Sequence, residues 1–94
     1  MDKVALLSLA SDLKRITQSI QRKAKRNTQI FNKEAKKWLK TAKKNSNPAI
    51  LRLLNSVDTV LKQKDDLKKA EDCLMYSVLI QNRVLVEPKL KGGE

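Results

Sequence analysis

Eleven lysine and arginine side chains between residues 14 and 44 recur at helical spacing, and no other group of residues in this sequence is better suited to binding chemistry. They are Lys14, Arg15, Arg22, Lys25, Arg26, Lys33, Lys36, Lys37, Lys40, Lys43 and Lys44. At about 100° per residue they fall in one sector of a helical wheel, opposite the apolar positions. Lys23 is the main exception. The pattern predicts one continuous basic face, and phosphate is the group that such a face would bind.

The positive charge belongs almost entirely to the first half of the chain. Of 94 residues, 21 are Lys or Arg and 10 are Asp or Glu, so the net charge is +11. Residues 1–44 hold 13 basic and 3 acidic side chains, whereas residues 45–94 hold 8 and 7. Like charges three or four residues apart destabilise a helix by about 0.2–0.5 kcal/mol per pair. A polyanion would relieve this repulsion.

The phosphate backbone of DNA or RNA is the polyanion that we expect. Duplex DNA carries one charge about every 1.7 Å of axis, and neutralising phosphates releases counterions. Lysine predominates here, and as a hydrated point charge it suits phosphate better than base edges. We therefore predict salt-sensitive binding with little sequence specificity. The predicted nucleic-acid-binding residues are Arg22, Lys25, Arg26, Lys33, Lys36, Lys37, Lys40, Lys43 and Lys44.

Other readings of the basic face stay open. A lysine-rich face can simply be solvated, or it can meet the acidic surface of a protein partner in a larger helical assembly. The segment 30–44 would also pass as a basic amphipathic helix at a membrane surface. Against a membrane role, Phe31, Trp38 and Leu39 have a matching apolar stripe later in the chain, and we expect them to pack against it.

The composition argues against an enzyme and against a cofactor or metal site. The chain has no histidine, a single cysteine (Cys73), and glycine only at positions 92 and 93, so it lacks a histidine base, a thiolate cage and a glycine-rich phosphate loop. The acidic cluster of Asp65, Asp66, Glu71 and Asp72 alternates with lysines, which favours ion pairs at helical spacing over a cation site.

The apolar residues predict an all-α fold. A first stripe runs from Leu6 to Ala24 and a second from Phe31 to Ala42, in the same phase. Residues 3–44 are therefore either one long helix or two helices separated by a break near Asn27 and Thr28. The Asn47-Pro48 pair marks a firmer boundary, because proline suits the first position of a helix. A third stripe follows, from Ile50 to Val78.

The simplest arrangement is a long antiparallel helical hairpin with coiled-coil-like packing, in which an arm of residues 3–44 and a turn at 45–47 precede an arm of residues 48–82. Two helices bury little surface, so we expect self-association into a homo-oligomer or packing on a helical partner. A compact four-helix bundle, broken near Asn27 and near Asp65, is the alternative. The expected core residues are Leu6, Leu13, Ile16, Ile20, Trp38, Leu53, Val57, Leu67 and Leu74.

The chain reads as one helical domain, residues 1–87, followed by a flexible tail, residues 88–94. The run Val84-Leu85-Val86 has some β character, and Pro88 is expected to end any helix. The apolar start of the chain only weakly resembles a leader peptide, and no apolar run approaches the roughly 20 residues of a membrane span. We therefore expect a cytoplasmic protein.

Overall fold

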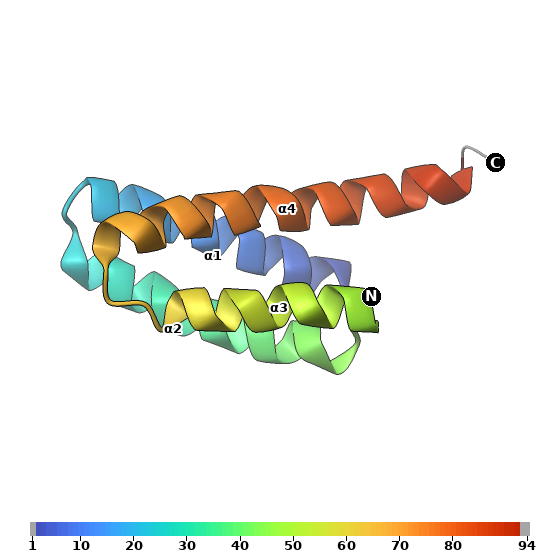
Figure 1. Ribbon diagram of the computed structural model, residues 1–94, viewed down its shortest axis with the longest axis horizontal. Coiled ribbons are helices and arrows are strands. Elements are labelled where there is room, and N and C mark those ends of the chain that lie inside the picture. Colours follow the sequence, from blue (N-terminus) through green and yellow to red (C-terminus); the bar gives the residue numbers. More distant parts are fainter. Residues whose placement is uncertain (1, 93–94) are drawn as a thin grey trace.

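The chain folds into a bundle of helices, as seen in a computed structural model (Figure 1). The structure describes the backbone of residues 2–92 and the side chains of residues 2–85. Within these limits it contains four helices, namely α1 (Lys3–Gln21), α2 (Lys25–Lys44), α3 (Pro48–Leu61) and α4 (Asp66–Gly92). No strand occurs among the residues described, and the all-α prediction is confirmed.

The four helices occupy the four corners of the bundle. Helix α1 packs extensively against both α2 and α4, while α3 touches the same two helices over a smaller surface. Helices α2 and α4 therefore lie at diagonal corners. This is the four-helix alternative. The long hairpin is not formed, because residues 3–44 are two helices that fold back on one another rather than one continuous arm.

The break between α1 and α2 falls at Arg22–Ala24, a few residues before the expected position. Lys23 adopts the left-handed conformation with φ of 58°. The Ala24 N–H then reaches the Ser19 carbonyl at 2.9 Å, and the Lys23 N–H reaches the Ile20 carbonyl at 3.0 Å. These two bonds close the helix end in the manner usually supplied by glycine. A lysine in this conformation costs about 1 kcal/mol, and no glycine stands at this position to mark the break.

The other two connections follow their capping residues. Asn47 caps α3, with its Oδ1 accepting from the Ile50 N–H at 2.9 Å, and Pro48 occupies the first turn. Asp65 caps α4, with its Oδ1 accepting from the Lys68 N–H at 3.3 Å. The interruption at Lys62–Asp65 is thus a short connection rather than part of a longer helix.

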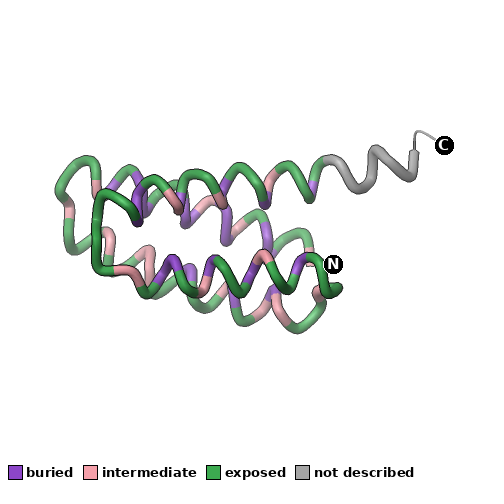
Figure 2. Tube along the Cα trace, in the orientation of Figure 1, coloured by how far each residue is buried: buried purple, intermediate pink, exposed green. Residues whose placement is uncertain are grey.

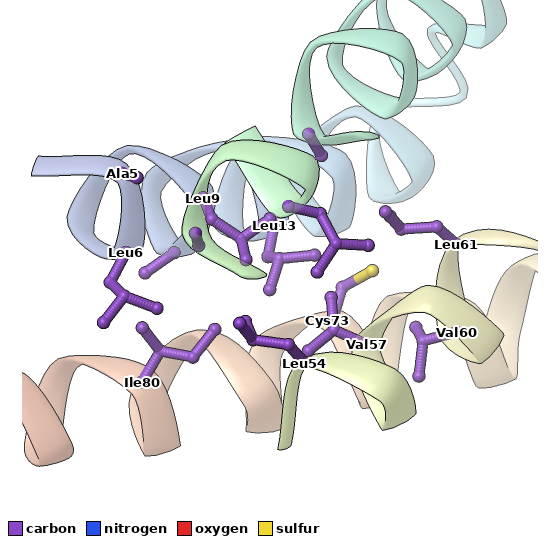
Figure 3. Packing of buried hydrophobic residues seen from close by; sticks show 14 of the residues in the cluster. Ala5, Leu6, Leu9, Leu13, Leu54, Val57, Val60, Leu61, Cys73 and Ile80 are labelled. Carbon is purple, nitrogen blue, oxygen red and sulfur yellow. The ribbon is translucent and has the colours of Figure 1, made fainter. Parts of the chain in front are cut away.

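The core runs along the inside of all four helices (Figure 3). Among the predicted core residues, Leu6, Leu13, Ile16 and Val57 are buried. The partly buried ones, Ile20, Trp38 and Leu53, pack against the cluster at its edge. The prediction is wrong for Leu67 and Leu74, which are exposed on α4.

Helix α4 turns its small residues inward, and this explains the exposed leucines. Its inner face carries Ala70, Cys73 and Ser77, whose size lets α4 approach α1 closely. The Thr17 hydroxyl donates to the Ala70 carbonyl at 2.7 Å, and the Ser77 hydroxyl donates to the Ala10 carbonyl at 2.9 Å. These buried bonds fix the rotation of α4, and Figure 2 shows exposed positions along its outer side. Leu67 and Leu74 are left on that side, whereas Ile80 and Val84 join the core.

Helix α4 also extends further than the sequence suggested. It continues through the Val84–Val86 run and past Pro88 to Gly92, whereas we expected the helix to end near Asn82. A proline inside a helix removes one hydrogen bond, but the flanking residues here are mostly good helix formers. The predicted flexibility of residues 88–94 stays a prediction, and residues 93–94 lie outside the described residues.

Candidate nucleic-acid interface

Helix α2 gathers most of the predicted binding residues on one surface, which we call the basic arc. Its members are Lys25, Arg26, Lys33, Lys36, Lys37, Lys40, Lys43 and Lys44. At 100° per residue they span an arc of about 120° on the wheel, with Ala35 and Leu39 on the opposite, buried side. All are exposed except Lys43, which is half-buried. The arc extends over about 30 Å of helix.

The remaining cations do not continue this arc. Lys14 and Arg15 are exposed on α1, and Arg22 is the C-cap residue of α1 in the turn before α2. Because α1 folds back against α2, the eleven cations do not form one continuous basic face, and that prediction is wrong. Arg22 lies next to the start of α2 along the chain, so all nine predicted binding residues belong to α2 or to the turn before it.

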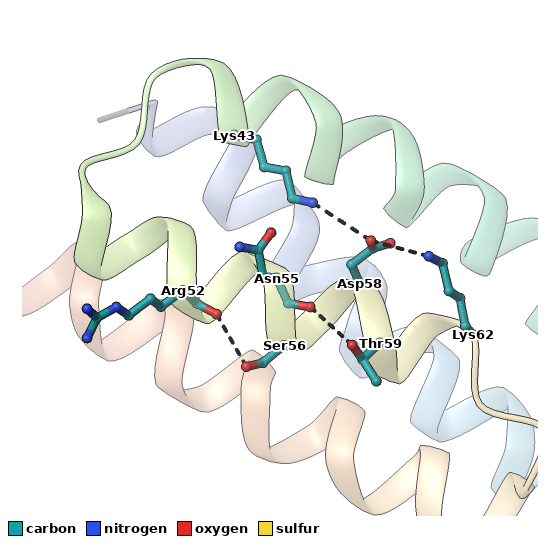
Figure 4. Close-up of polar contacts among 7 residues, drawn as sticks. All are labelled: Lys43, Arg52, Asn55, Ser56, Asp58, Thr59 and Lys62. Carbon is teal, nitrogen blue, oxygen red and sulfur yellow. Dashed lines mark hydrogen bonds and ion pairs between the residues drawn. The ribbon is translucent and has the colours of Figure 1, made fainter.

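The basic arc is almost free of counter-charges. Of the basic arc, only Lys43 has an ion pair with a described side chain, and its Nζ lies 3.8 Å from Asp58 Oδ2 on α3 (Figure 4). Asp58 is shared with Lys62, whose Nζ lies 3.5 Å away. No described carboxylate lies within ion-pair distance of the other seven members. The like-charge repulsion along α2 is therefore not relieved within the described part of the chain.

The apolar face of α2 holds the basic arc outward. Leu39 is buried, and Phe31 and Trp38 pack against the core from its edge. Leu39 therefore packs inside the bundle, and Phe31 and Trp38 cover the edge of its core. On the same side, the Arg15 guanidinium stacks 5.8 Å from the centre of the Phe31 ring.

The only acid on α2, Glu34, is exposed and lies outside the basic arc, next to α1. Glu34 lies beside Asp12 of α1, whose side chain is 1% exposed. Burial, followed by the Glu34 carboxylate, raises the pKa of Asp12 to about 6, although Arg15 lies 3.5 Å from its Oδ1. Asp12 Oδ2 has no hydrogen-bond partner in the described structure. Glu34 therefore takes part in the α1–α2 contact and leaves the charge of the arc unopposed.

A buried lysine from α4 adds to the cations near the start of α2. Lys69 is 7% exposed, and its Nζ donates to the Leu61 carbonyl at 3.0 Å. Burial lowers the pKa of Lys69, and the nearby Lys36 ammonium also lowers it. Lys69 has no ion pair with any described carboxylate. The i,i+4 pairs expected from the sequence, Asp65 with Lys69 and Lys68 with Asp72, are not formed.

Two hollows border Lys69. The smaller one, about 220 Å³, has a lining that includes Lys33, Lys36 and Lys69, together with the polar side chains of Thr28, Gln29 and Asn32. The larger one, about 820 Å³, lies between the end of α1 and the starts of α2 and α4, and Ile20, Leu67 and Leu74 are among its lining residues. Sequence reasoning missed Lys69, and the Lys68-Lys69 pair was its only signal.

The sequence also singled out Cys73 and the acidic cluster of α4. Cys73 is fully buried, and its burial raises the pKa of its thiol to about 12. The described part of the chain brings no three metal-binding side chains together. Instead of joining a cluster, Asp72 accepts a hydrogen bond from Gln63 Nε2 at 2.9 Å.

The chain matches no family model, no curated protein and no solved structure. Its function is therefore inferred from its own residues. Among the described helices, none combines the length and the apolar character that crossing a membrane requires.

Proposed function

We propose that this protein is a non-enzymatic nucleic-acid-binding protein that grips the phosphate backbone of DNA or RNA through the basic arc of α2. The observation that carries the proposal is the arc itself, in which seven exposed cations on a single helix lack any described acidic partner. Binding would release counterions from the nucleic acid and relieve repulsion within α2. We propose further that binding occurs in the cytoplasm with little sequence preference.

The lysine-lined hollow supports a defined phosphate position within this surface. Lys33 and Lys36 come from α2, and Lys69 reaches the same hollow from α4. A phosphate placed there would give the buried Lys69 ammonium the anion that it lacks among the described residues. Hydrogen bonds between a charged donor and a phosphate are roughly twice as strong as those between neutral groups.

The proposal is tested by reversing the charge of three arc residues together. In the variant Lys36→Glu/Lys37→Glu/Lys40→Glu, we expect affinity for duplex DNA and for single-stranded RNA to fall by about 100-fold in low salt. Every sequence should be affected about equally, because phosphates carry no sequence information. Fluorescence anisotropy with labelled oligonucleotides measures the change, and circular dichroism confirms that the variant folds.

A matched control separates the arc from the overall charge. Lys3, Lys64 and Arg83 are exposed and lie on elements other than α2. Reversing all three lowers the net charge of the chain by the same amount, and we expect affinity to fall by less than about fivefold. Equal losses in the two triple variants would show that the arc is not the binding surface.

A second candidate function is a helical interaction subunit of a larger assembly, whose basic arc meets an acidic protein. The exposed apolar residues of α4 favour this candidate, since large exposed apolar patches mark protein contacts. Polyglutamate distinguishes the two. A nucleic-acid binder should release polyglutamate at much lower salt than duplex DNA, whereas an acidic-partner module should bind both alike. Self-association also remains a prediction, and the outer face of α4 supports it.

A further inference from the structure

The outer face of α4 carries a row of residues at the spacing of a coiled-coil contact. Its members, which we call the α4 seam, are Leu67, Glu71, Leu74, Val78, Gln81 and Leu85. Steps of four and three residues alternate along the row, which keeps all six on one side of the helix. This spacing is the one that packs a second helix alongside the first.

The apolar members of the seam are unusually accessible. Leu67 is 74% exposed, Leu74 is 42%, Val78 is 46% and Leu85 is 64%. Single exposed leucines are ordinary, but four large apolar side chains aligned on one helix face mark a contact surface. The inner face of α4 is already satisfied by its hydrogen bonds with α1, so rotating α4 to bury the seam would break them.

The order of residues in the seam is self-complementary when a second copy of α4 runs antiparallel. With residue 76 at the centre of the pairing, Leu67 faces Leu85 of the second copy and Leu74 faces Val78 of the second copy. Glu71 then faces Gln81 of the second copy, so a carboxylate meets an amide that can donate to it. In a parallel pair, each Glu71 would face its own counterpart and the two charges would repel.

A cavity lies beside the end of the seam that would receive Leu85 of the second copy. Leu67, Glu71 and Leu74 help to line the 820 Å³ cavity, together with Ile20, Ala24 and Ala70. In the antiparallel pairing, Leu85 of the second copy lies over Leu67, at the edge of this cavity. The two-fold axis places the same contact at both ends of the pair, as a self-complementary interface requires.

We propose that two copies of this protein form a symmetric dimer through an antiparallel pairing of their α4 seams. Sedimentation equilibrium without nucleic acid tests this, at concentrations up to about 1 mM so that dissociation constants as weak as ~1 mM are detected. A mass near twice 10.7 kDa is expected at high concentration. A mass of one chain throughout would overturn the proposal. Because no nucleic acid is present, this outcome is independent of the proposed function.

Charge variants at the polar pair test the direction of the pairing without altering the core. Gln81→Glu places two carboxylates together twice in each dimer and should weaken dimerisation by about tenfold. Gln81→Lys should strengthen it by a similar factor, because lysine then meets Glu71. The double variant Glu71→Lys/Gln81→Glu restores opposite charges at this pair, so it should dimerise within about threefold of Gln81→Lys and more tightly than the wild type.

Parallel pairing makes the opposite prediction for two of these variants. Gln81→Lys would bring like charges together and weaken the dimer. The double variant would also weaken it, because each substituted position would face its own counterpart. Either result would overturn the antiparallel arrangement. Ile30→Ser provides a control on another helix. Ile30 is exposed on α2, at the corner of the bundle diagonal to α4, so this substitution should leave dimerisation unchanged.

Discussion

Helices α2 and α4 stand at diagonal corners of the same bundle, yet their outer faces differ in kind. The outer face of α2 carries seven exposed cations without described acidic partners, whereas that of α4 carries leucine and valine side chains. Both helices contribute an inner face to one core. The difference indicates that the bundle is a scaffold with two separate surfaces, one suited to a polyanion and the other to an apolar helix.

The two surfaces also respond differently to their surroundings. Contacts between lysine and phosphate are weakened by salt, because they derive from counterion release. Apolar contacts between helices are not weakened by salt and grow stronger with salts that are excluded from the surface. Four measurements test whether the two surfaces differ in this way.

The largest expected effect is the difference in unfolding free energy between a substitution in the core and one on the α4 seam. Leu54→Ala removes a fully buried side chain and should lower the free energy of unfolding by about 2–5 kcal/mol. Leu74→Ala removes an exposed one and should cost less than about 1 kcal/mol at concentrations where the protein is a single chain. Urea denaturation followed by circular dichroism measures both. A similar cost for the two would mean that the α4 seam is part of the core.

Salt should affect one surface strongly and the other hardly at all. Raising salt from about 50 to about 200 mM should weaken duplex binding by about 100-fold if four phosphates are neutralised. Over the same range, the dimerisation constant should change by less than about threefold. A steep salt dependence of dimerisation would show that charge, rather than the apolar seam, holds the two chains together.

The free energy of unfolding should depend on pH through Asp12, the neighbour of Glu34 on α1. Because burial and Glu34 raise the pKa of Asp12 to about 6 from its usual 3.8, the folded state binds this proton more tightly than the unfolded state. The stabilisation is therefore complete below about pH 4 and is lost as the pH rises through about 6. Asp12→Asn should remove this dependence and be more stable than the wild type by about 1–2 kcal/mol at pH 8.

The wild-type and Asp12→Asn proteins are compared by urea denaturation between pH 4 and pH 8. The difference between them isolates Asp12 from the other carboxylates. Glu34→Gln should lower the pKa of Asp12 and leave nucleic-acid affinity nearly unchanged, because Glu34 lies outside the basic arc. If the free energies of unfolding of the wild type and Asp12→Asn change with pH in parallel, the pKa of Asp12 is not raised in the folded protein.

The smallest effect distinguishes two lysines within the basic arc. Lys40 is exposed without a described ion pair, whereas Lys43 is paired with Asp58. Lys40→Ala should reduce the slope of log affinity against log salt by about 0.9 on duplex DNA, the value for one phosphate. Lys43→Ala should change it by less than half of that. If Lys43→Ala has the larger effect, the centre of the interface lies nearer to α3.

The sequence predicted the surface on α2 because that surface depends on local spacing alone. Its cations and its apolar face lie within one helix, and the boundary after it is marked by Asn47-Pro48 at the start of α3. The break at Lys23 escaped prediction because a lysine occupies a conformation normally taken by glycine. One signal was present, since Lys23 was the residue that fell outside the cationic sector.

The orientation of α4 could not be predicted from hydrophobicity, because both of its faces are apolar. Large side chains such as Leu67 and Leu74 form the more prominent stripe, but the smaller Ala70 and Ser77 allow closer packing on α1. The hydroxyl bonds from Thr17 and Ser77 decide between the two faces, and they join residues more than fifty positions apart. The buried Lys69 ammonium donates to the Leu61 carbonyl, eight positions earlier at the end of α3.

The diagonal placement of α2 and α4 has a mechanical consequence. If two chains join through α4, their α2 helices end up on the outer sides of the pair and point in opposite directions. Such a particle would bridge two separate strands instead of coating one, and it would draw long nucleic acids into networks that scatter light. Chains held apart by Gln81→Glu would still bind, but they would leave each strand independent of its neighbours.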